Sequence, residues 1–160
     1  SLSFACGGNT DNNATDNTNA TEVTEAKDNN AQDKAQEEVE ITIVASGNTM
    51  SEIHYDPASI TVPAGAKVKV TLINESTAAG MLHNFVLVPQ GAGEEIAKAG
   101  WAQADNDYVA DDDRIVVASD MLDMGEETTF EFEAPAAGSY HYICTYPGHY
   151  PQMVGRLTVK

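Results

Sequence analysis

The stretch Cys144-Thr-Tyr-Pro-Gly-His149-Tyr-Pro-Gln-Met153 places three different metal-binding side chains within ten residues. A thiolate, an imidazole and a thioether are donors that suit copper, and a cysteine with two histidines and a weak axial methionine is a recurrent copper ligand set. The second histidine is available upstream, in Met81-Leu-His83-Asn-Phe85. The sequence therefore predicts one copper site on His83, Cys144, His149 and Met153.

The spacing within the stretch has a physical basis. Tyr146-Pro-Gly-His149 matches a type II turn, with proline at the second position and glycine supplying the positive φ that the third position requires. Such a turn folds the chain back after Cys144 and brings His149 beside the sulfur. His83 then has to arrive from another strand, so that the fold itself closes the site.

Alternative roles for these side chains fit the pattern less well. A cysteine beside a histidine is often only a small buried apolar group near an unrelated imidazole. A catalytic pair of Cys144 and His149 would need an orienting third residue and an oxyanion hole, and the sequence marks neither. Structural zinc takes four strong ligands, for which a thioether is a poor donor, so zinc is expected only as a substitute for copper.

The pattern from residue 39 onward predicts β-strands. Short apolar runs alternate with polar residues and are separated by glycine and proline, which is typical of an all-β sandwich. In Tyr140-His-Tyr-Ile-Cys144, the period of two places the tyrosines and Cys144 on one face and His141 on the other. The expected strands are 40–45, 59–63, 67–73, 83–88, 114–118, 128–133, 139–144 and 154–159.

Residues 92–110 interrupt this pattern. A short helix is expected to begin after Gly93, with Ile96 and Trp101 on its buried side, and Asp111-Asp-Asp113 marks a solvated loop. We expect a helix that caps the core, and nothing in the segment alone supports a partner-docking surface. His54 lies in a turn-like stretch and is expected to be exposed.

The N-terminal part has a different composition. Residues 7–38 are almost devoid of large apolar side chains, so they cannot bury enough surface to offset their ordering entropy, and residues 1–38 are expected to form a disordered acidic tether. Ser1-Leu-Ser-Phe-Ala-Cys6 resembles the end of a bacterial lipoprotein signal, in which the cysteine is lipidated, although a plain tail also fits. A disulfide from Cys6 to Cys144 is disfavoured because it would consume the thiolate of the metal motif.

The overall composition limits the partners. The 160 residues include 25 acidic and 8 basic side chains, a formal net charge of −17. Nucleic acid is excluded as a partner because phosphate binding requires basic patches, whereas a basic protein partner fits such a field. No stretch of 18 apolar residues occurs, so the sequence predicts no membrane-spanning helix.

Residues 39–160 resemble the cupredoxins, the small blue copper proteins, and within them the azurin and auracyanin branch. The motifs that carry the resemblance are the stretch from Cys144 to Met153, Leu82-His-Asn-Phe-Val-Leu-Val88, Val62-Pro-Ala-Gly65 and Gly155-Arg-Leu-Thr-Val159. The resemblance implies a Greek-key β-sandwich with a short helical insertion and one type 1 copper per chain. It also implies that Asn84 hydrogen-bonds to the ligand loop near Thr145. Azurins carry glycine where this chain has Leu82, which favours a four-coordinate site here.

The resemblance further implies a monomeric single-electron carrier that is not an enzyme and works outside the cytoplasm. The signal-like start of the chain adds the expectation of a lipid anchor at Cys6. The partners of the carrier would be redox proteins such as a basic cytochrome, an oxidase or a photosynthetic complex. Electrons would pass through the edge of His149, among Pro147, Tyr150 and Pro151. The alternative is a copper delivery or storage protein without redox turnover. A copper enzyme is disfavoured because four histidines without a His-x-His pair leave too few ligands for a second site.

Overall fold

The structure, a computed structural model, describes residues 35–160. The predicted lipidation site Cys6 and nearly all of the predicted tether lie outside these residues. The first strand begins at Glu38, and the backbone already contacts the domain before it, since the Lys67 N–H donates to the Glu37 carbonyl at 2.8 Å. No helix within residues 35–160 is both long and apolar enough to cross a membrane.

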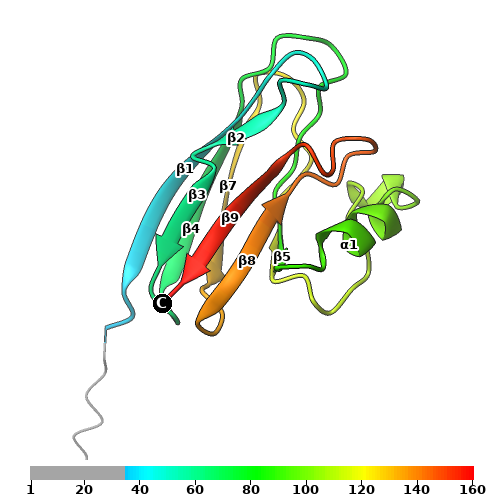
Figure 1. Ribbon diagram of the computed structural model, residues 1–160. Helices are drawn as coiled ribbons and strands as arrows, with labels where there is room; N and C mark the ends of the chain where they lie inside the picture. Colours follow the sequence, from blue (N-terminus) through cyan, green and yellow to red (C-terminus); the bar gives the residue numbers. More distant parts are fainter. Residues whose placement is uncertain (1–34) are drawn as a thin grey trace, which may run out of the picture. The chain divides into compact units, whose positions relative to one another are not determined.

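Two β-sheets pack face to face and form the predicted sandwich (Figure 1). One sheet has the strand order β2-β1-β4-β7, and the other has the order β3-β9-β8-β5-β6. Pairing is parallel between β1 and β4 and between β3 and β9, and antiparallel elsewhere. The strands are β1 (Glu38–Ser46), β2 (His54–Asp56), β3 (Ser59–Val62), β4 (Lys67–Asn74), β5 (Val86–Pro89), β6 (Val117–Ala118), β7 (Glu127–Glu133), β8 (Gly138–Ile143) and β9 (Val154–Val159).

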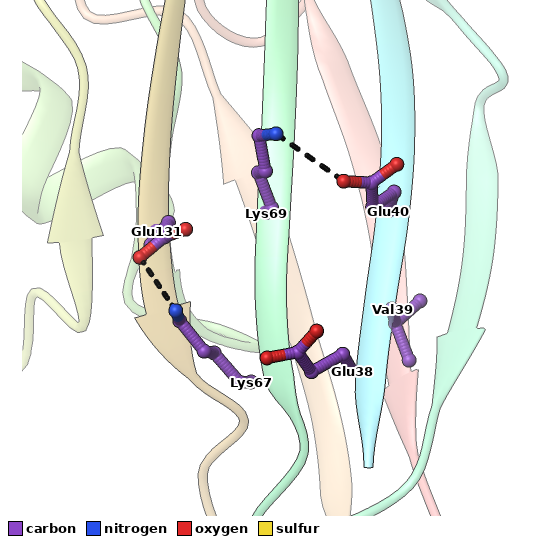
Figure 2. Close-up of a pocket in the computed structure, with 6 residues that line it drawn as sticks. All are labelled: Glu38, Val39, Glu40, Lys67, Lys69 and Glu131. Carbon is purple, nitrogen blue, oxygen red and sulfur yellow. Dashed lines mark hydrogen bonds and ion pairs between the residues drawn. The ribbon is translucent and has the colours of Figure 1, made fainter.

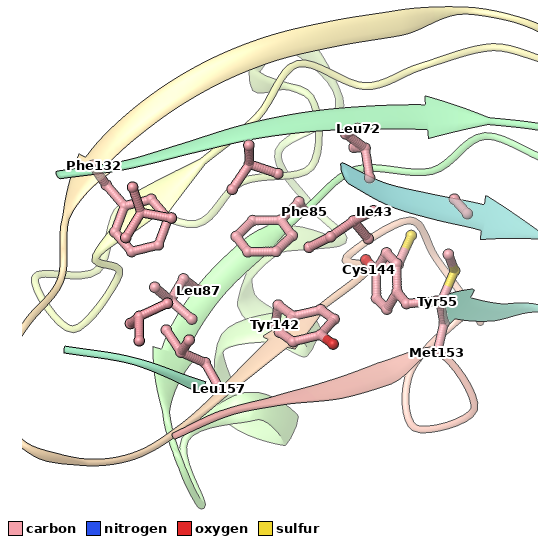
Figure 3. Packing of buried hydrophobic residues seen from close by; sticks show 14 of the residues in the cluster. Ile43, Tyr55, Leu72, Phe85, Leu87, Phe132, Tyr142, Cys144, Met153 and Leu157 are labelled. Carbon is pink, nitrogen blue, oxygen red and sulfur yellow. The ribbon is translucent and has the colours of Figure 1, made fainter. Parts of the chain in front are cut away.

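The core between the sheets follows from the period-two pattern of the strands. Side chains such as Ile43 and Leu72 from one sheet meet Leu87, Tyr142 and Leu157 from the other, and all of them are fully buried (Figure 3). Each such side chain contributes roughly 1.5–3 kcal/mol through burial. Cys144 and Met153 belong to the same cluster and occupy one end of it. The metal-binding side chains are therefore an extension of the core.

The outer face of the four-stranded sheet is charged instead of apolar. Lys67 and Glu131 form an ion pair at 3.1 Å, and Lys69 and Glu40 form another at 3.2 Å (Figure 2). The four side chains are 44–78% exposed. This face agrees with the lysine alternation that the sequence shows in β4.

Helix α1 (Gly93–Gly100) lies outside the sandwich beside β5 and β8 (Figure 1). It buries Ile96 and Ala97 against Val86 and Val88 of β5, in a second apolar cluster that also includes Ile143. Strand β5 is consequently buried on both faces. The predicted core-capping helix is thus present, followed by a single 3₁₀ turn at Ala104–Asn106.

Several sequence expectations differ from the structure in detail. Trp101 is 38% exposed, because five residues at 3.6 per turn place it about 140° around the helix from Ile96. The expected strand 83–88 is regular only from Val86, and that at 114–118 only over Val117–Ala118. Residues 54–56, expected to be turn-like, form β2 because they pair with the C-terminal end of β1.

Candidate metal centre

Three of the predicted ligands converge at one end of the sandwich. One ligand atom from each of His83, Cys144 and His149 lies within 4.8 Å of the others. Nδ1 of His149 is 3.5 Å from the Cys144 Sγ, and Nδ1 of His83 is 3.9 Å from it. The exposed fractions of these residues are 0–1%. Two imidazole nitrogens therefore face one sulfur in a closed pocket of protein.

The loop after β8 positions three of these four side chains. Cys144 directly follows the strand, and the His149 N–H donates to the Tyr146 carbonyl at 3.0 Å while Gly148 has φ of +87°. These are the features of the predicted type II turn, and a side chain at Gly148 would strain it. The loop then closes on itself, because the Met153 N–H donates to the His149 carbonyl and the Cys144 N–H to the Met153 carbonyl. Met153 is fully buried and directly precedes β9 in the chain.

His83 lies in the segment that leads into β5, the strand that pairs with β8. It forms an isolated antiparallel bridge with Leu122, and its Nε2 lies 3.2 Å from the Ser76 Oγ. The Ser76 hydroxyl donates its own proton to the Gly47 carbonyl at 2.9 Å. It must then accept from Nε2–H, which assigns the proton to Nε2 and leaves the Nδ1 lone pair directed at Cys144.

Asn84 connects the His83 segment to the ligand loop. Its Nδ2 donates to Thr145 Oγ1 at 2.8 Å, and its Oδ1 accepts the Thr145 N–H at 2.9 Å. Nδ2 also donates to the backbone carbonyl of Asp107 at 3.1 Å, and the backbone carbonyl of Asn84 accepts from the Tyr55 hydroxyl. One buried amide thus fixes the distance between two segments that lie 61 residues apart in the chain.

Burial sets the protonation of the site. It raises the pKa of the Cys144 thiol to about 11, although backbone hydrogen bonds from Asn84 and Tyr146 act in the opposite direction. Burial lowers the pKa of His149 to about 4, and burial together with His149 lowers that of His83 to about 4. Both imidazoles are therefore neutral at pH 7 and offer lone pairs, and a soft cation that displaces the thiol proton fits this donor set.

Within residues 35–160, the remaining sulfur and imidazole groups lie away from this cluster or at its edge. Met81 and Met121 are half-buried, whereas Met50 and Met124 are 46% and 47% exposed. His54 is exposed, as predicted. The Leu82 carbonyl oxygen lies 3.9 Å from the Cys144 Sγ, as near as Nδ1 of His83. The four-coordinate site inferred from Leu82 stays a prediction.

The structure also adds residues that the sequence did not indicate. Ser76 sets the His83 tautomer, and the Tyr55 hydroxyl donates to the Asn84 backbone carbonyl. Ser76 lies in an irregular loop and Tyr55 in the short strand β2, and neither segment carries a periodic signal. The edge of His149, through which electrons are expected to pass, does not reach the surface, because the residue is 1% exposed and its ring lies against that of Tyr146, with 4.9 Å between centroids.

A β-sandwich that holds a buried His-Cys-His cluster at one end defines the cupredoxin class of blue copper proteins. The chain belongs to the family of copper binding proteins named plastocyanin/azurin, whose model matches residues 39–160. This family transfers electrons and binds one copper ion per domain, and here His83, Cys144, His149 and Met153 are arranged as in a type 1 site.

Individual relatives agree with this assignment. The chain is 41% identical to auracyanin-A of Chloroflexus aurantiacus over 71% of this chain and 72% of that protein. It is 36% identical to azurin iso-2 of Methylomonas sp. strain J over 74% of this chain and 96% of that protein. The solved structure of dithionite-reduced auracyanin from the photosynthetic bacterium Roseiflexus castenholzii superimposes with a TM-score of 0.69 at 35% identity, covering 76% of this chain and 97% of that one. The predicted azurin and auracyanin branch is thereby confirmed.

Proposed function

We propose that this protein carries single electrons between redox proteins, with His83, Cys144, His149 and Met153 as the copper ligands. The observation that carries the proposal is the approach of both Nδ1 atoms to the Cys144 Sγ, at 3.5 and 3.9 Å, inside a fully buried cluster. Copper bound there supplies a one-electron change between Cu(II) and Cu(I).

The residues of the chain favour rapid electron exchange by holding one geometry. Cys144 is fixed by β8, His83 by its bridge to Leu122, and the two segments are joined by the Asn84–Thr145 hydrogen bonds. Because these contacts do not depend on the charge of the site, both oxidation states occupy nearly the same cage. Little rearrangement then accompanies the transfer.

Absorption spectroscopy tests the ligand assignment. Adding Cu(II) to the metal-free protein should produce an intense blue band from charge transfer between Cys144 sulfur and copper, and voltammetry should give a reversible one-electron wave. Cys144→Ser should lose the band, whereas Cys6→Ser is the matched control and should keep it. A strong blue band that survives in Cys144→Ser would refute the assignment.

The alternative of copper delivery or storage makes a different prediction. A delivery site has to release Cu(I) readily, whereas ligands that are 0–1% exposed favour retention. We therefore expect slow transfer of copper to a Cu(I) chelator, over hours, alongside reversible redox cycling. Transfer within the mixing time together with an absent redox wave would instead support delivery.

The location and partners extend the proposal. We propose a monomer on the outer face of a membrane, with residues 1–38 as a tether acylated at Cys6, residues 39–160 as the copper domain, and no enzymatic activity. Mass spectrometry of the protein extracted from native membranes would detect the acyl chains. The partner would be a basic cytochrome, an oxidase or a photosynthetic complex, and the last is supported by the photosynthetic origin of the similar Roseiflexus auracyanin.

A further inference from the structure

A continuous series of aromatic rings leads from the surface to the metal cluster. The Tyr108 and Tyr146 rings pack edge to face, with 5.3 Å between centroids and an interplanar angle of 76°. Tyr146 in turn packs on His149, with 4.9 Å between centroids. Both tyrosines are half-buried, whereas His149 is buried. The tyrosines are therefore the groups through which His149 meets the solvent on this side.

The backbone at Tyr108 is held in an unusual conformation. Asp107 and Tyr108 have φ of +51° and +59°, a region that is unfavourable for non-glycine residues and persists only where the surroundings impose it. Here the Tyr108 N–H donates to the Gln103 carbonyl at 2.9 Å, and Asn84 Nδ2 donates to the Asp107 carbonyl. A Cβ atom at Gly100 would overlap the Tyr108 carbonyl oxygen, so this close approach requires glycine.

These contacts join the helical insertion to the metal site. The same Asn84 amide that bonds Thr145 also bonds Asp107, and the ring that follows rests on Tyr146 of the ligand loop. A helix that only capped the core would need neither contact. The arrangement instead holds Tyr108, a half-buried tyrosine, at a fixed position relative to His149.

The surroundings of Tyr108 are strongly acidic. The two basic residues that flank Tyr108 in the sequence are already paired. Lys98 pairs with Glu94 at 2.6 Å, and Arg114 pairs with Asp112 and Glu95 at 2.6 and 2.9 Å. Over residues 104–113, four further carboxylates form no ion pair with any part of the chain that the structure covers: Asp105, Asp107, Asp111 and Asp113. The surface beside the tyrosine is thus complementary to a positively charged protein.

We propose that a basic one-electron redox protein docks on residues 104–113 and exchanges its electron through Tyr108 and Tyr146, an inference that rests on the proposed electron-carrier function. In each transfer the partner's reduced centre loses one electron and the copper site gains one. Neither tyrosine is oxidised or deprotonated, because the rings serve only as the contact path between the partner and His149.

The competing docking surface is the exposed ligand loop around Pro147 and Pro151. Tyr150 of that loop packs inward on the cluster beneath helix α1, so it is less available to a partner. The two surfaces are distinguished by amide chemical shifts of the ¹⁵N-labelled protein loaded with Zn(II), titrated with reduced cytochrome c as a basic probe. We expect the shifts to concentrate on residues 104–113 and Tyr146, and shifts confined to residues 147–151 would overturn the proposal.

Two substitutions at one position test the path. Tyr108→Gly removes the ring and suits the positive φ, whereas Tyr108→Phe retains the ring and is the matched control. We expect the second-order rate of reduction by cytochrome c to fall about tenfold in Tyr108→Gly, the size of one aromatic interface anchor. The same rate in Tyr108→Phe should stay near that of the parent. Equal rates in all three proteins would overturn the proposal.

Two substitutions that each remove one negative charge test the docking surface separately. Asp105→Asn should weaken cytochrome c binding and reduce the salt dependence of the rate, whereas Glu133→Gln, at the end of β7 that pairs with the start of β4, should change both much less. Equal effects of the two substitutions would mean that only net charge matters, and would overturn the docking site.

Controls separate this inference from the proposed function. The blue band, the reduction potential and reduction by ascorbate should be the same in Tyr108→Gly and the parent, because Tyr108 does not touch the ligands. If the parent itself showed no reversible reduction by ascorbate, the electron-carrier function would fail and the inference with it. If only the cytochrome c rates were insensitive to Tyr108, the function would stand and the inference alone would fail.

Discussion

The metal end of the sandwich and the outer face of the four-stranded sheet both connect distant segments through polar side chains, but in different surroundings. At the metal end, Asn84 makes its bonds to Thr145 and Asp107 in the buried interior. On the sheet face, Lys69 meets Glu40 at a comparable distance, 3.2 Å, in contact with water (Figure 2). Buried polar groups are costly when unpaired, whereas exposed ion pairs add little, so similar distances imply different contributions to stability.

The largest difference between the metal end and the sheet face is expected when the metal-free protein is acidified. The pKa values of His83 and His149 lie near 4 in the folded chain, against 6.5 for an unperturbed histidine. Because the folded pKa is depressed, the unfolded chain binds protons first, and the domain loses stability progressively as the pH falls from about 6.5 to 4. Thermal unfolding across this range, monitored by circular dichroism, measures the loss.

A pair of substitutions identifies the source of that pH dependence. His83→Gln should make the profile shallower between pH 6.5 and 4, with the contribution of His149 remaining, while His54→Gln, which replaces an exposed histidine, is the matched control and should leave it unchanged. Parallel profiles in all three proteins would show that other groups cause the acid sensitivity and would remove this distinction between the two regions.

The next effect in size concerns the buried amide. Asn84→Ala leaves the Thr145 N–H and the Thr145 hydroxyl without partners and creates a cavity, which should lower the free energy of unfolding by about 2–4 kcal/mol. The measurement is urea denaturation of the metal-free protein at pH 7. A loss below about 1 kcal/mol would mean that water replaces the amide, which its burial argues against.

Met153→Leu should have a smaller effect on stability but a visible effect on the site. The swap conserves volume in a fully buried position and should cost less than about 1.5 kcal/mol. Copper and colour should be retained, and voltammetry should show a higher reduction potential, since loss of a weak donor destabilises Cu(II) more than Cu(I). An unchanged potential would exclude Met153 as the axial ligand and direct attention to Met81.

The smallest effect is expected on the sheet face. Lys69→Ala should change the free energy of unfolding by no more than about 0.5 kcal/mol, because both partners of its ion pair are largely hydrated. Urea denaturation in low and high salt measures it. A loss in the free energy of unfolding comparable to that of Asn84→Ala would show that the ion pairs of the sheet face form a structural network. The contrast between the two regions would then disappear.

The sequence predicted those features that depend on local pattern. The turn at Gly148 and the alternation through Tyr142 and Cys144 each follow from a few adjacent residues, and both are present. The longer strands other than β5 also follow from such alternation, whereas β5 is buried on both faces. Helix α1 could be expected from composition, but which of its faces is buried depends on β5, so Trp101 was placed incorrectly.

Features that no periodic pattern or turn motif marks could not be predicted. Strand β2 exists because it pairs with the end of β1 across the loop of residues 47–53, and Ser76 reaches His83 across an irregular loop. The contact of Tyr108 with Tyr146 arises only once the insertion is folded against the ligand loop. None of these residues shows a period or spacing that distinguishes it from an ordinary loop residue.

The long separation between His83 and Cys144 also has a consequence for how the protein folds. The two residues lie 61 positions apart, the segment between them includes four strands and helix α1, and the neighbouring sheet depends on parallel pairing of β1 with β4. Such non-local contacts form late and slowly. The Cys144 thiol therefore stays accessible to oxidants until the sandwich closes, and the speed of closure determines how much of the newly made protein keeps a thiol able to bind copper.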